Sequence, residues 1–131
     1  MNKFKILLVG AGQLGSRHLQ AIATLPAVGE IHVVDPRPES LELARVRLRE
    51  VSDTNPAIVF KWHTDPAACC AGGDLCIIAT QAKDRPALIK RIAEQFSYKK
   101  FLIEKIVSQS VGEYQDLMEY IKKHSLRVWV H

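Results

Sequence analysis

The chain has few cysteines, no long apolar run and no large excess of charge of one sign. Its three cysteines, Cys69, Cys70 and Cys76, show neither an even count nor a C-x-x-C spacing, which argues against a disulfide framework. We therefore expect reduced, buried thiols and a cytoplasmic protein. No apolar run approaches the length of a membrane span. Residues 1–3 lead directly into an apolar run, so we expect no signal peptide.

Charge and composition are those of an ordinary globular domain. The 131 residues carry a net charge of +4, and 47% of them are hydrophobic, which is enough for one domain with a real core. Arg45, Arg47 and Arg49 spread around the polar side of an expected helix. Because no nucleic-acid-binding motif accompanies them, we expect no nucleic-acid partner and no membrane partner.

Short apolar runs alternate with helical patterns along the whole chain. Strands are predicted at 5–9, 30–34, 58–62, 75–79, 101–104 and 127–130. Continuous apolar runs of this kind are typical of parallel strands covered on both faces. The predicted fold over residues 1–131 is therefore α/β, a Rossmann doubly wound sheet of six parallel strands in the order 3-2-1-4-5-6 with helices on both faces. Its ligand crevice would lie at the carboxyl ends of strands one and four, where the winding reverses.

Helices are predicted between the strands. They begin near Leu14, at Pro38, after Asp65, before Leu88 and after Ser110. Their apolar stripes are expected to face the core, among them Leu14, His18 and Ile22 in the first helix and Tyr114, Leu117 and Met118 in the last.

The strongest chemical motif lies between Phe4 and Asp35. An apolar run leads into Gly10-Ala11-Gly12-Gln13-Leu14-Gly15, and a helix pattern and a second apolar run follow. The second run ends at Asp35, 20 residues after the third glycine. Strand, glycine turn, helix, strand and acid in this order are typical of a dinucleotide-binding unit.

Each residue of the motif has a separate physical role. Gly10 permits the tight turn, Gly12 lets the backbone approach a pyrophosphate, and Gly15 lets the helix pack closely on the sheet. The amides that open the helix, at Gln13 and Leu14, attract phosphate.

The acid at the end of the second strand predicts which nicotinamide cofactor binds. Asp35 can accept hydrogen bonds from both hydroxyls of the adenosine ribose and would repel a 2′-phosphate, which favours NAD over NADP. Arg37, two residues later, can partly offset that repulsion.

Two further segments end strands on the same side of the predicted sheet. Thr80 and Gln81 follow strand four, where the Thr80 hydroxyl can reach the nicotinamide ribose. Glu104 and Lys105 follow strand five. Taken alone, Lys105 fits an ordinary surface lysine, and Glu104 fits a structural partner for a basic neighbour.

Three motifs together resemble the glucose–fructose oxidoreductase and inositol dehydrogenase family (Gfo/Idh/MocA). They are the glycine turn extended to His18, the strand-four ending at 77–80, and the strand-five ending at 101–105, which is similar to the family's E-K-P motif. The resemblance implies that the glycine turn and Asp35 hold the dinucleotide and that Thr80 lies near its nicotinamide half. It also implies that Glu104 and Lys105 face the reaction centre, with Lys105 as the catalytic residue that orients the substrate hydroxyl.

The resemblance also implies an oxidoreductase acting on a sugar, cyclitol or nucleotide sugar. In the family a carboxyl-terminal domain supplies the proton-transfer histidine and commonly the homo-oligomer contact, and we expect that domain to be absent from this chain. No metal is implied. Two alternatives stay open: a sensor that binds NAD without turnover, and a related imine or biliverdin-type reductase, against which the Glu104-Lys105 pair argues.

Some residues depart from the family pattern or keep two interpretations. Gln81 and Ile106 stand where the family has proline, and Arg85 stands near a common histidine. Loss of proline alters how the preceding residue is aimed. For His18 we favour helix packing over a ligand role. His131 has no neighbouring residues in a pattern that supports catalysis or a metal site.

Overall fold

The computed structural model describes residues 3–68, 72–80, 85–105 and 109–131. Its elements are β1 (Phe4–Val9), α1 (Gln13–Ile22), β2 (Val28–Val34), α2 (Pro38–Arg49), β3 (Val59–His63), a 3₁₀ turn η1 (Pro66–Ala68), β4 (Leu75–Ile78), α3 (Arg85–Phe96), β5 (Lys100–Ile103), α4 (Val111–Lys123) and β6 (Arg127–Val130).

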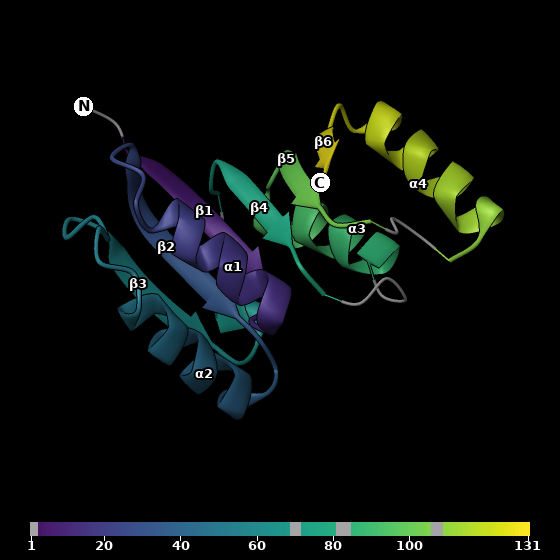
Figure 1. Ribbon diagram of the computed structural model, residues 1–131. Helices are drawn as coiled ribbons and strands as arrows, with labels where there is room; N and C mark the ends of the chain where they lie inside the picture. Colours follow the sequence, from purple (N-terminus) through teal and green to yellow (C-terminus); the bar gives the residue numbers. More distant parts are fainter. Residues whose placement is uncertain (1–2, 69–71, 81–84, 106–108) are drawn as a thin grey trace.

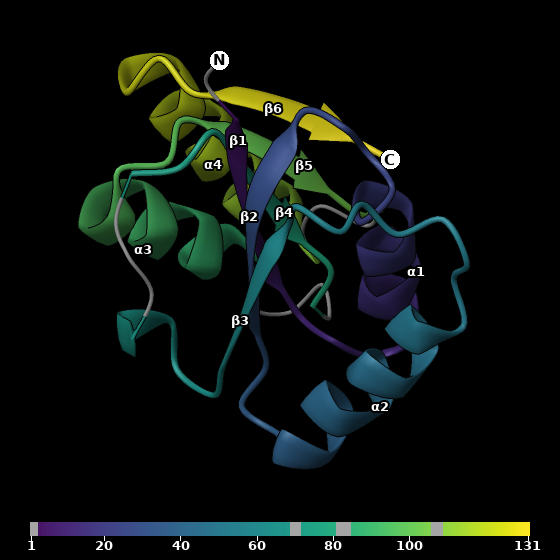
Figure 2. The same cartoon turned by 90° about the vertical axis from the view of Figure 1, so that its left-hand side faces the viewer.

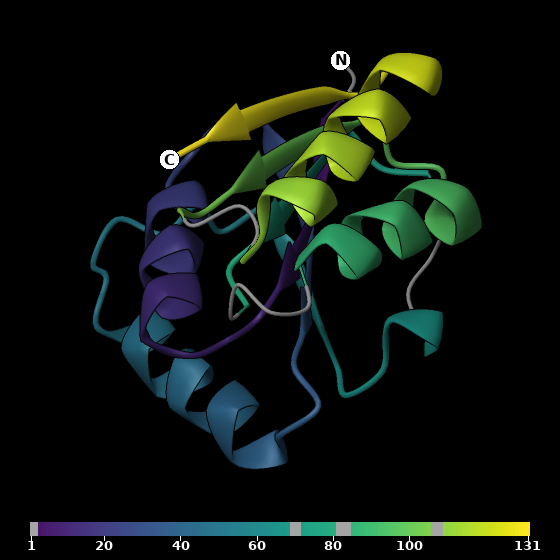
Figure 3. The same ribbon diagram turned by 90° about the vertical axis from the view of Figure 1, so that its right-hand side faces the viewer.

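The six strands form a single parallel sheet in the order β3-β2-β1-β4-β5-β6 (Figure 1). This confirms the predicted Rossmann topology. The winding reverses between β1 and β4, because the helices that follow them, α1 and α3, lie on opposite faces of the sheet (Figures 2 and 3), and folds of this kind have their ligand crevice at that point.

Helices α1 and α2 cover one face of the sheet, and α3 and α4 cover the other, as the two side views agree (Figures 2 and 3). Because side chains alternate along a strand, neighbouring residues of β1 enter different cores. Leu8 packs with Leu19 of α1 and Leu41 of α2. Leu7 packs with Ile89 of α3 and Leu117 of α4.

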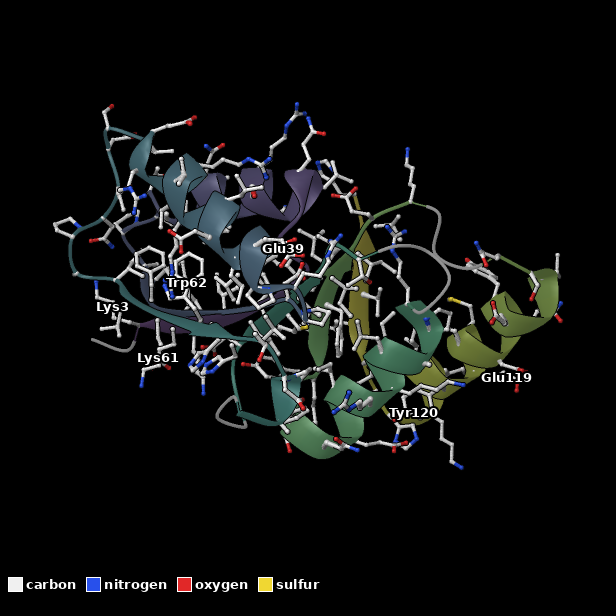
Figure 4. The ribbon with its side chains drawn as sticks, turned by 90° about the horizontal axis from the view of Figure 1, so that it is seen from below. Lys3, Glu39, Lys61, Trp62, Glu119 and Tyr120 are labelled. Carbon is white, nitrogen blue, oxygen red and sulfur yellow. The ribbon has the colours of Figure 1, made fainter. Side chains whose placement is uncertain are left out.

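Polar contacts add to the packing between the outer helices. The hydroxyl of Tyr120 on α4 donates to Glu94 Oε1 on α3 at 2.9 Å, and Figure 4 shows Tyr120 turned toward α3. Ser110 caps α4 by accepting the Glu113 N–H at 3.1 Å, as its sequence predicts.

The prediction that Leu14, Tyr114 and Met118 face the core is wrong. Leu14, Tyr114 and Met118 are exposed, whereas Ile22 and Leu117 are buried. The α1 face that meets the sheet is made instead by Gly15, Ser16, Leu19 and Ile22. Small residues at the start of α1 let its axis come close to the sheet, which rotates Leu14 outward over the crevice.

Two further findings complete the fold. Cys76 is buried in β4, as expected, while Cys69 and Cys70 lie outside the described residues. Within the described segments, no helix has the combined length and apolarity needed to cross a bilayer.

Candidate functional site

A groove of about 530 Å³ opens at the carboxyl ends of β1, β2 and β4, where the winding reverses. This is the position predicted for the ligand crevice. Its lining consists of Gly10, Gly12, Gln13, Leu14, Asp35, Pro36, Arg37, Ala79, Thr80 and Arg85.

Two of the three motif glycines are required by the close packing of the turn. Gly10 has a φ of +101°, and a Cβ there would lie 2.9 Å from the backbone of Ala79. A Cβ on Gly15 would overlap the carbonyl oxygen of Gly10. The start of α1 therefore rests directly on the turn, and Gly15 acts through packing rather than as part of the groove lining.

Gly12 differs from both, because none of the residues that the structure describes lies within 4 Å of the Cβ that it lacks. Its φ of −73° is one that any residue adopts. The empty space belongs to the groove and adjoins the first turn of α1, whose amides have no partners within the helix. Within the described part of the chain no side chain caps this end of α1, and its first turn holds no acidic residue, so the site attracts an anion.

Asp35 closes the groove at the end of β2. Its side chain is almost fully buried, and Oδ2 accepts the backbone N–H of Ala11 at 2.8 Å. Oδ1 accepts the backbone N–H of Arg37 at 2.9 Å, and the exposed Arg37 guanidinium lies 3.5 Å from the same oxygen. A carboxylate offers about four acceptor positions, so Asp35 can still accept from a ligand hydroxyl.

At the β4 side of the groove, the hydroxyl of Thr80 is buried and finds no hydrogen-bond partner among the described residues. A buried polar atom of this kind calls for a partner, and its position in the groove lining supplies a place for one.

Arg85 lies beneath that end of the groove. Its Nε donates to the Thr80 carbonyl at 2.8 Å, and its Nη1 donates to the Glu104 carbonyl at 2.7 Å. The guanidinium is only 4% exposed and joins the ends of β4 and β5. Burial lowers the pKa of Arg85, and the charge of Glu104 acts in the opposite direction.

Glu104 is bound by two histidines that are distant in sequence. His18 Nε2 of α1 lies 2.5 Å from Glu104 Oε1, and His131 Nδ1 lies 3.5 Å from Oε2. Burial alone would raise the pKa of Glu104, but the hydrogen bonds and charges of the two histidines outweigh it and lower this pKa below its ordinary value. The expectation that His18 only packs is thus replaced by a direct contact with the strand-five motif.

The structure brings most of the predicted site residues together. Seven of the predicted residues line the groove, Gly10, Gly12, Gln13, Leu14, Asp35, Arg37 and Thr80. Glu104 is joined to it through Arg85, and Lys105 is exposed at the end of β5. Gln81 and Ile106 lie outside the described residues.

Pro36, Ala79 and Arg85 line the groove but were not predicted as site residues. Pro36 and Ala79 adjoin predicted positions, so only their neighbours pointed to them. One feature of the sequence singled out Arg85, namely that it stands near a position where the family commonly has histidine. No local sequence pattern, however, predicts its contact with Glu104.

The geometry fits a dinucleotide. It combines open space at Gly12, the uncapped start of α1, a buried carboxylate at Asp35 and a Thr80 hydroxyl without a partner among the described residues. Fold and site together define a dinucleotide-binding domain.

A comparison with protein families matches residues 4–131 to the Gfo/Idh/MocA family, described as "Oxidoreductase family, NAD-binding Rossmann fold". The chain belongs to this family, which confirms the resemblance drawn from its three motifs and the expectation of NAD as the family's cofactor. A comparison with curated proteins finds no match.

Solved structures with the same fold are longer proteins. An oxidoreductase from Agrobacterium radiobacter in complex with NAD+, L-tartaric acid and magnesium is 20% identical, with a TM-score of 0.77 over 99% of this chain and 35% of that one. The WlbA dehydrogenase from Bordetella pertussis, in complex with NADH and UDP-GlcNAcA, is 20% identical, with a TM-score of 0.76 over 99% and 37%.

The scyllo-inositol dehydrogenase from Lactobacillus casei, with bound NAD(H) and scyllo-inositol, is 20% identical, with a TM-score of 0.76 over 98% and 36%. The chain thus spans about a third of the length of these structures.

Proposed function

We propose that this chain is the cofactor-binding part of an NAD-dependent oxidoreductase that moves a hydride between nicotinamide and a secondary alcohol of a sugar, cyclitol or nucleotide sugar. The observation that carries the proposal is the vacant space at Gly12, which faces the uncapped start of α1 within the groove. Glycine is not needed there for folding, and a bound pyrophosphate explains its presence.

The chain's own residues have separate parts in this proposal. The amides of Gln13 and Leu14 bind the pyrophosphate, and Asp35 accepts hydrogen bonds from the adenosine ribose. Thr80 donates its hydroxyl near the nicotinamide ribose, with Gln81 beside it in sequence. When bound, NAD supplies the hydride acceptor, and the protein supplies orientation and electrostatics.

NAD is favoured over NADP because the Asp35 carboxylate stands where a 2′-phosphate would lie. The positive charge of Arg37 opposes this repulsion of the 2′-phosphate, but its guanidinium lies 3.5 Å from Asp35 Oδ1 and is mostly exposed to solvent. A cation already paired with the neighbouring carboxylate attracts a phosphate less strongly.

The substrate class rests on relatives that bind scyllo-inositol or UDP-GlcNAcA. Lys105 is the proposed reaction-centre residue, which would orient and polarise the alcohol whose carbon loses hydride. The proton-transfer histidine, the substrate pocket and the homo-oligomer contact would belong to a carboxyl-terminal domain, so the 131-residue chain alone should bind cofactor without turnover.

Titration calorimetry of the chain with NAD and with NADP tests the cofactor part. Saturable NAD binding that is tighter than NADP binding supports the proposal, and no heat with either nucleotide up to millimolar levels contradicts it.

In the full polypeptide, Lys105→Met should lower kcat far more than NAD affinity. Full activity of that variant removes Lys105 from the reaction centre, and NAD binding without turnover of any polyol favours a sensor.

A further inference from the structure

Three side chains that can bind a metal ion meet at the carboxyl ends of β5 and β6, beside the first helix. His18 comes from α1, Glu104 directly follows β5, and His131 directly follows β6. Each offers one ligand atom, and the three atoms all lie within 4.8 Å of one another. Among the described residues, this is the one group of three such side chains that could hold a metal ion. No spacing along the sequence predicts it, because 86 positions separate His18 from Glu104.

The carboxylate of Glu104 lies between the two histidines. Its Oε1 lies 2.5 Å from His18 Nε2, and its Oε2 lies 3.5 Å from His131 Nδ1, so each imidazole meets a different oxygen. The two imidazole rings meet edge to face, with centroids 5.6 Å apart. Two imidazole nitrogens and a carboxylate oxygen therefore surround one small volume.

Other contacts hold the backbone that carries these side chains. Arg85 Nη1 donates to the Glu104 carbonyl at 2.7 Å, and this bond leaves both carboxylate oxygens to the imidazoles. The backbone N–H of His131 donates to the Ile103 carbonyl at 2.8 Å, so His131 continues the pairing of β6 with β5. His18 stands within α1, and both side views show the end of β6 next to that helix (Figures 2 and 3). Ligands that are positioned in advance lose less conformational freedom when an ion binds.

Two imidazoles and one carboxylate are a donor set that binds Zn²⁺ in proteins, with the fourth position open to water or to another ligand. We propose that His18, Glu104 and His131 form a binding site for Zn²⁺. The side chains of Glu104 and His18 are 10% and 14% exposed, whereas that of His131 is 70% exposed, so an ion can enter past His131. The bound ion would offset the charge of a nearly buried carboxylate and would join α1 to the ends of β5 and β6.

The distances require one small adjustment. Zn²⁺ binds imidazole nitrogen and carboxylate oxygen at about 2.0–2.2 Å, which places the ligand atoms of a tetrahedral site roughly 3.4 Å apart. The 3.5 Å between His131 and Glu104 already agrees with this separation. The contact of His18 with Glu104 has to lengthen by roughly 1 Å, a shift that rotation about the side-chain bonds of Glu104 supplies.

A second glutamate with two histidines, on β2 and β3, lacks this arrangement. His32 Nδ1 lies 3.1 Å from His63 Nε2, while His32 Nε2 lies 3.3 Å from Glu30 Oε2. The two neighbours thus stand at opposite nitrogens of one ring, and in this arrangement a single ion cannot bind all three side chains. His63 is therefore the matched control for the proposed site.

Zinc titration of the 131-residue chain tests the proposal, after a chelator has removed metal and with the cysteines kept reduced. We expect one ion per chain. His131→Ala, at an exposed side chain, should weaken zinc affinity by roughly a hundredfold, because a lost ligand costs at least as much as the about 10–100-fold loss caused by outer-shell changes. Glu104→Gln keeps the shape of the side chain and should also weaken binding. His63→Asn should bind zinc as the wild-type chain does.

Co²⁺ in place of Zn²⁺ identifies the kind of ligand. Nitrogen and oxygen ligands should give visible d–d bands without the near-ultraviolet charge-transfer band of a thiolate. A stability measurement gives an independent readout, because an ion that binds only the folded chain raises its melting temperature. Saturating Zn²⁺ should therefore raise the melting temperature of the wild-type chain and of His63→Asn, but not that of His131→Ala.

Four results overturn the proposal. They are the absence of saturable zinc binding, equal zinc affinity in the wild type and in His131→Ala, a thiolate band with Co²⁺, and a loss of affinity in His63→Asn as large as that in His131→Ala. The thiolate band would assign the ion to cysteine. The site does not rest on NAD binding, and NAD titration in the presence of the chelator reports separately on the proposed function.

Discussion

The carboxylate of Asp35 accepts the backbone N–H of Ala11 at 2.8 Å, so the residue expected to bind ribose also holds the glycine turn in place. The bond joins the end of β2 to the middle of the turn after β1, across 24 positions of sequence. The same side chain therefore has a structural role and a proposed ligand role, and substitutions can separate the two.

Asp35→Ala should destabilise the protein and weaken NAD binding together. A buried Ala11 amide without an acceptor costs about 1–3 kcal/mol, and loss of charge-assisted bonds to a ribose lowers NAD affinity by roughly tenfold or more. Asp35→Asn keeps an acceptor for the buried Ala11 N–H but turns its NH2 toward the partly exposed Arg37 N–H, so its stability loss should be smaller than that of Asp35→Ala but not zero, while the preference for NAD over NADP still narrows. Urea unfolding and calorimetric titration measure the two effects. Asp116→Ala, on the exposed side of α4, is the control, and an unchanged cofactor preference in both Asp35 variants would remove Asp35 from the site.

Gly12→Val should abolish NAD binding without unfolding the protein. The new side chain enters space that none of the described parts of the chain occupies, at a φ any residue adopts, so stability should change by about 0.5 kcal/mol or less. The valine then blocks the position proposed for the pyrophosphate. Normal NAD affinity in this variant would contradict the proposed pose.

Two other glycines serve as controls for that experiment. Gly112→Ala, in the first turn of α4, also has no described residue near its new Cβ and should leave NAD binding unchanged while stabilising the helix by less than about 1 kcal/mol. Gly15→Ala should instead lower the melting temperature, because its Cβ overlaps the Gly10 carbonyl oxygen.

Arg85→Met should destabilise the protein by about 3 kcal/mol, since it removes two donors from the buried carbonyls of Thr80 and Glu104. Arg85→Lys should recover only part of the lost stability, because one ammonium group cannot reproduce the two separate N–H donors of a guanidinium that reach both strand ends. Denaturant unfolding measures the effect. Arg91→Met, at an exposed position of the same helix, should change stability by less than about 0.5 kcal/mol. Equal small effects at both positions would exclude a bridging role for Arg85.

The stability of the protein should fall in acid as Glu104 takes up a proton. The folded-state pKa of Glu104 lies below its ordinary value of 4.5, so its contribution is complete above that value and is lost as the pH falls through the folded pKa. His18→Asn should raise the pKa of Glu104, because burial, which favours the neutral acid, is then opposed by His131 alone. Carbon NMR of the Glu104 carboxyl, recorded as a function of pH, measures this pKa in the wild-type protein and in His18→Asn. His124→Asn, on α4, is the control, and an unshifted Glu104 titration in His18→Asn would show that the two side chains do not interact.

The sequence alone predicted the fold and the dinucleotide half of the site because both depend on local patterns. The apolar runs and the spacing from Gly10 to Asp35 belong to one β-α-β unit, whose geometry is set by short-range chain connectivity. Gly10 is required by its positive φ and Gly15 by its contact with the Gly10 carbonyl, and both lie within that unit, so the motif could be recognised without the rest of the molecule.

What only the tertiary structure decided involves residues that meet across the sheet. His18, Glu104 and His131 come from α1 and the ends of β5 and β6, and Arg85 joins the ends of the two neighbouring strands that precede and follow α3 in sequence. The exposure of Leu14 at the groove and of Trp129 on β6 depends equally on which helices pack against which strands. A sequence records which residues are near one another along the chain, whereas burial and long-range polar contacts depend on how closely elements distant in sequence approach, and that distance is set by the packing of the whole domain.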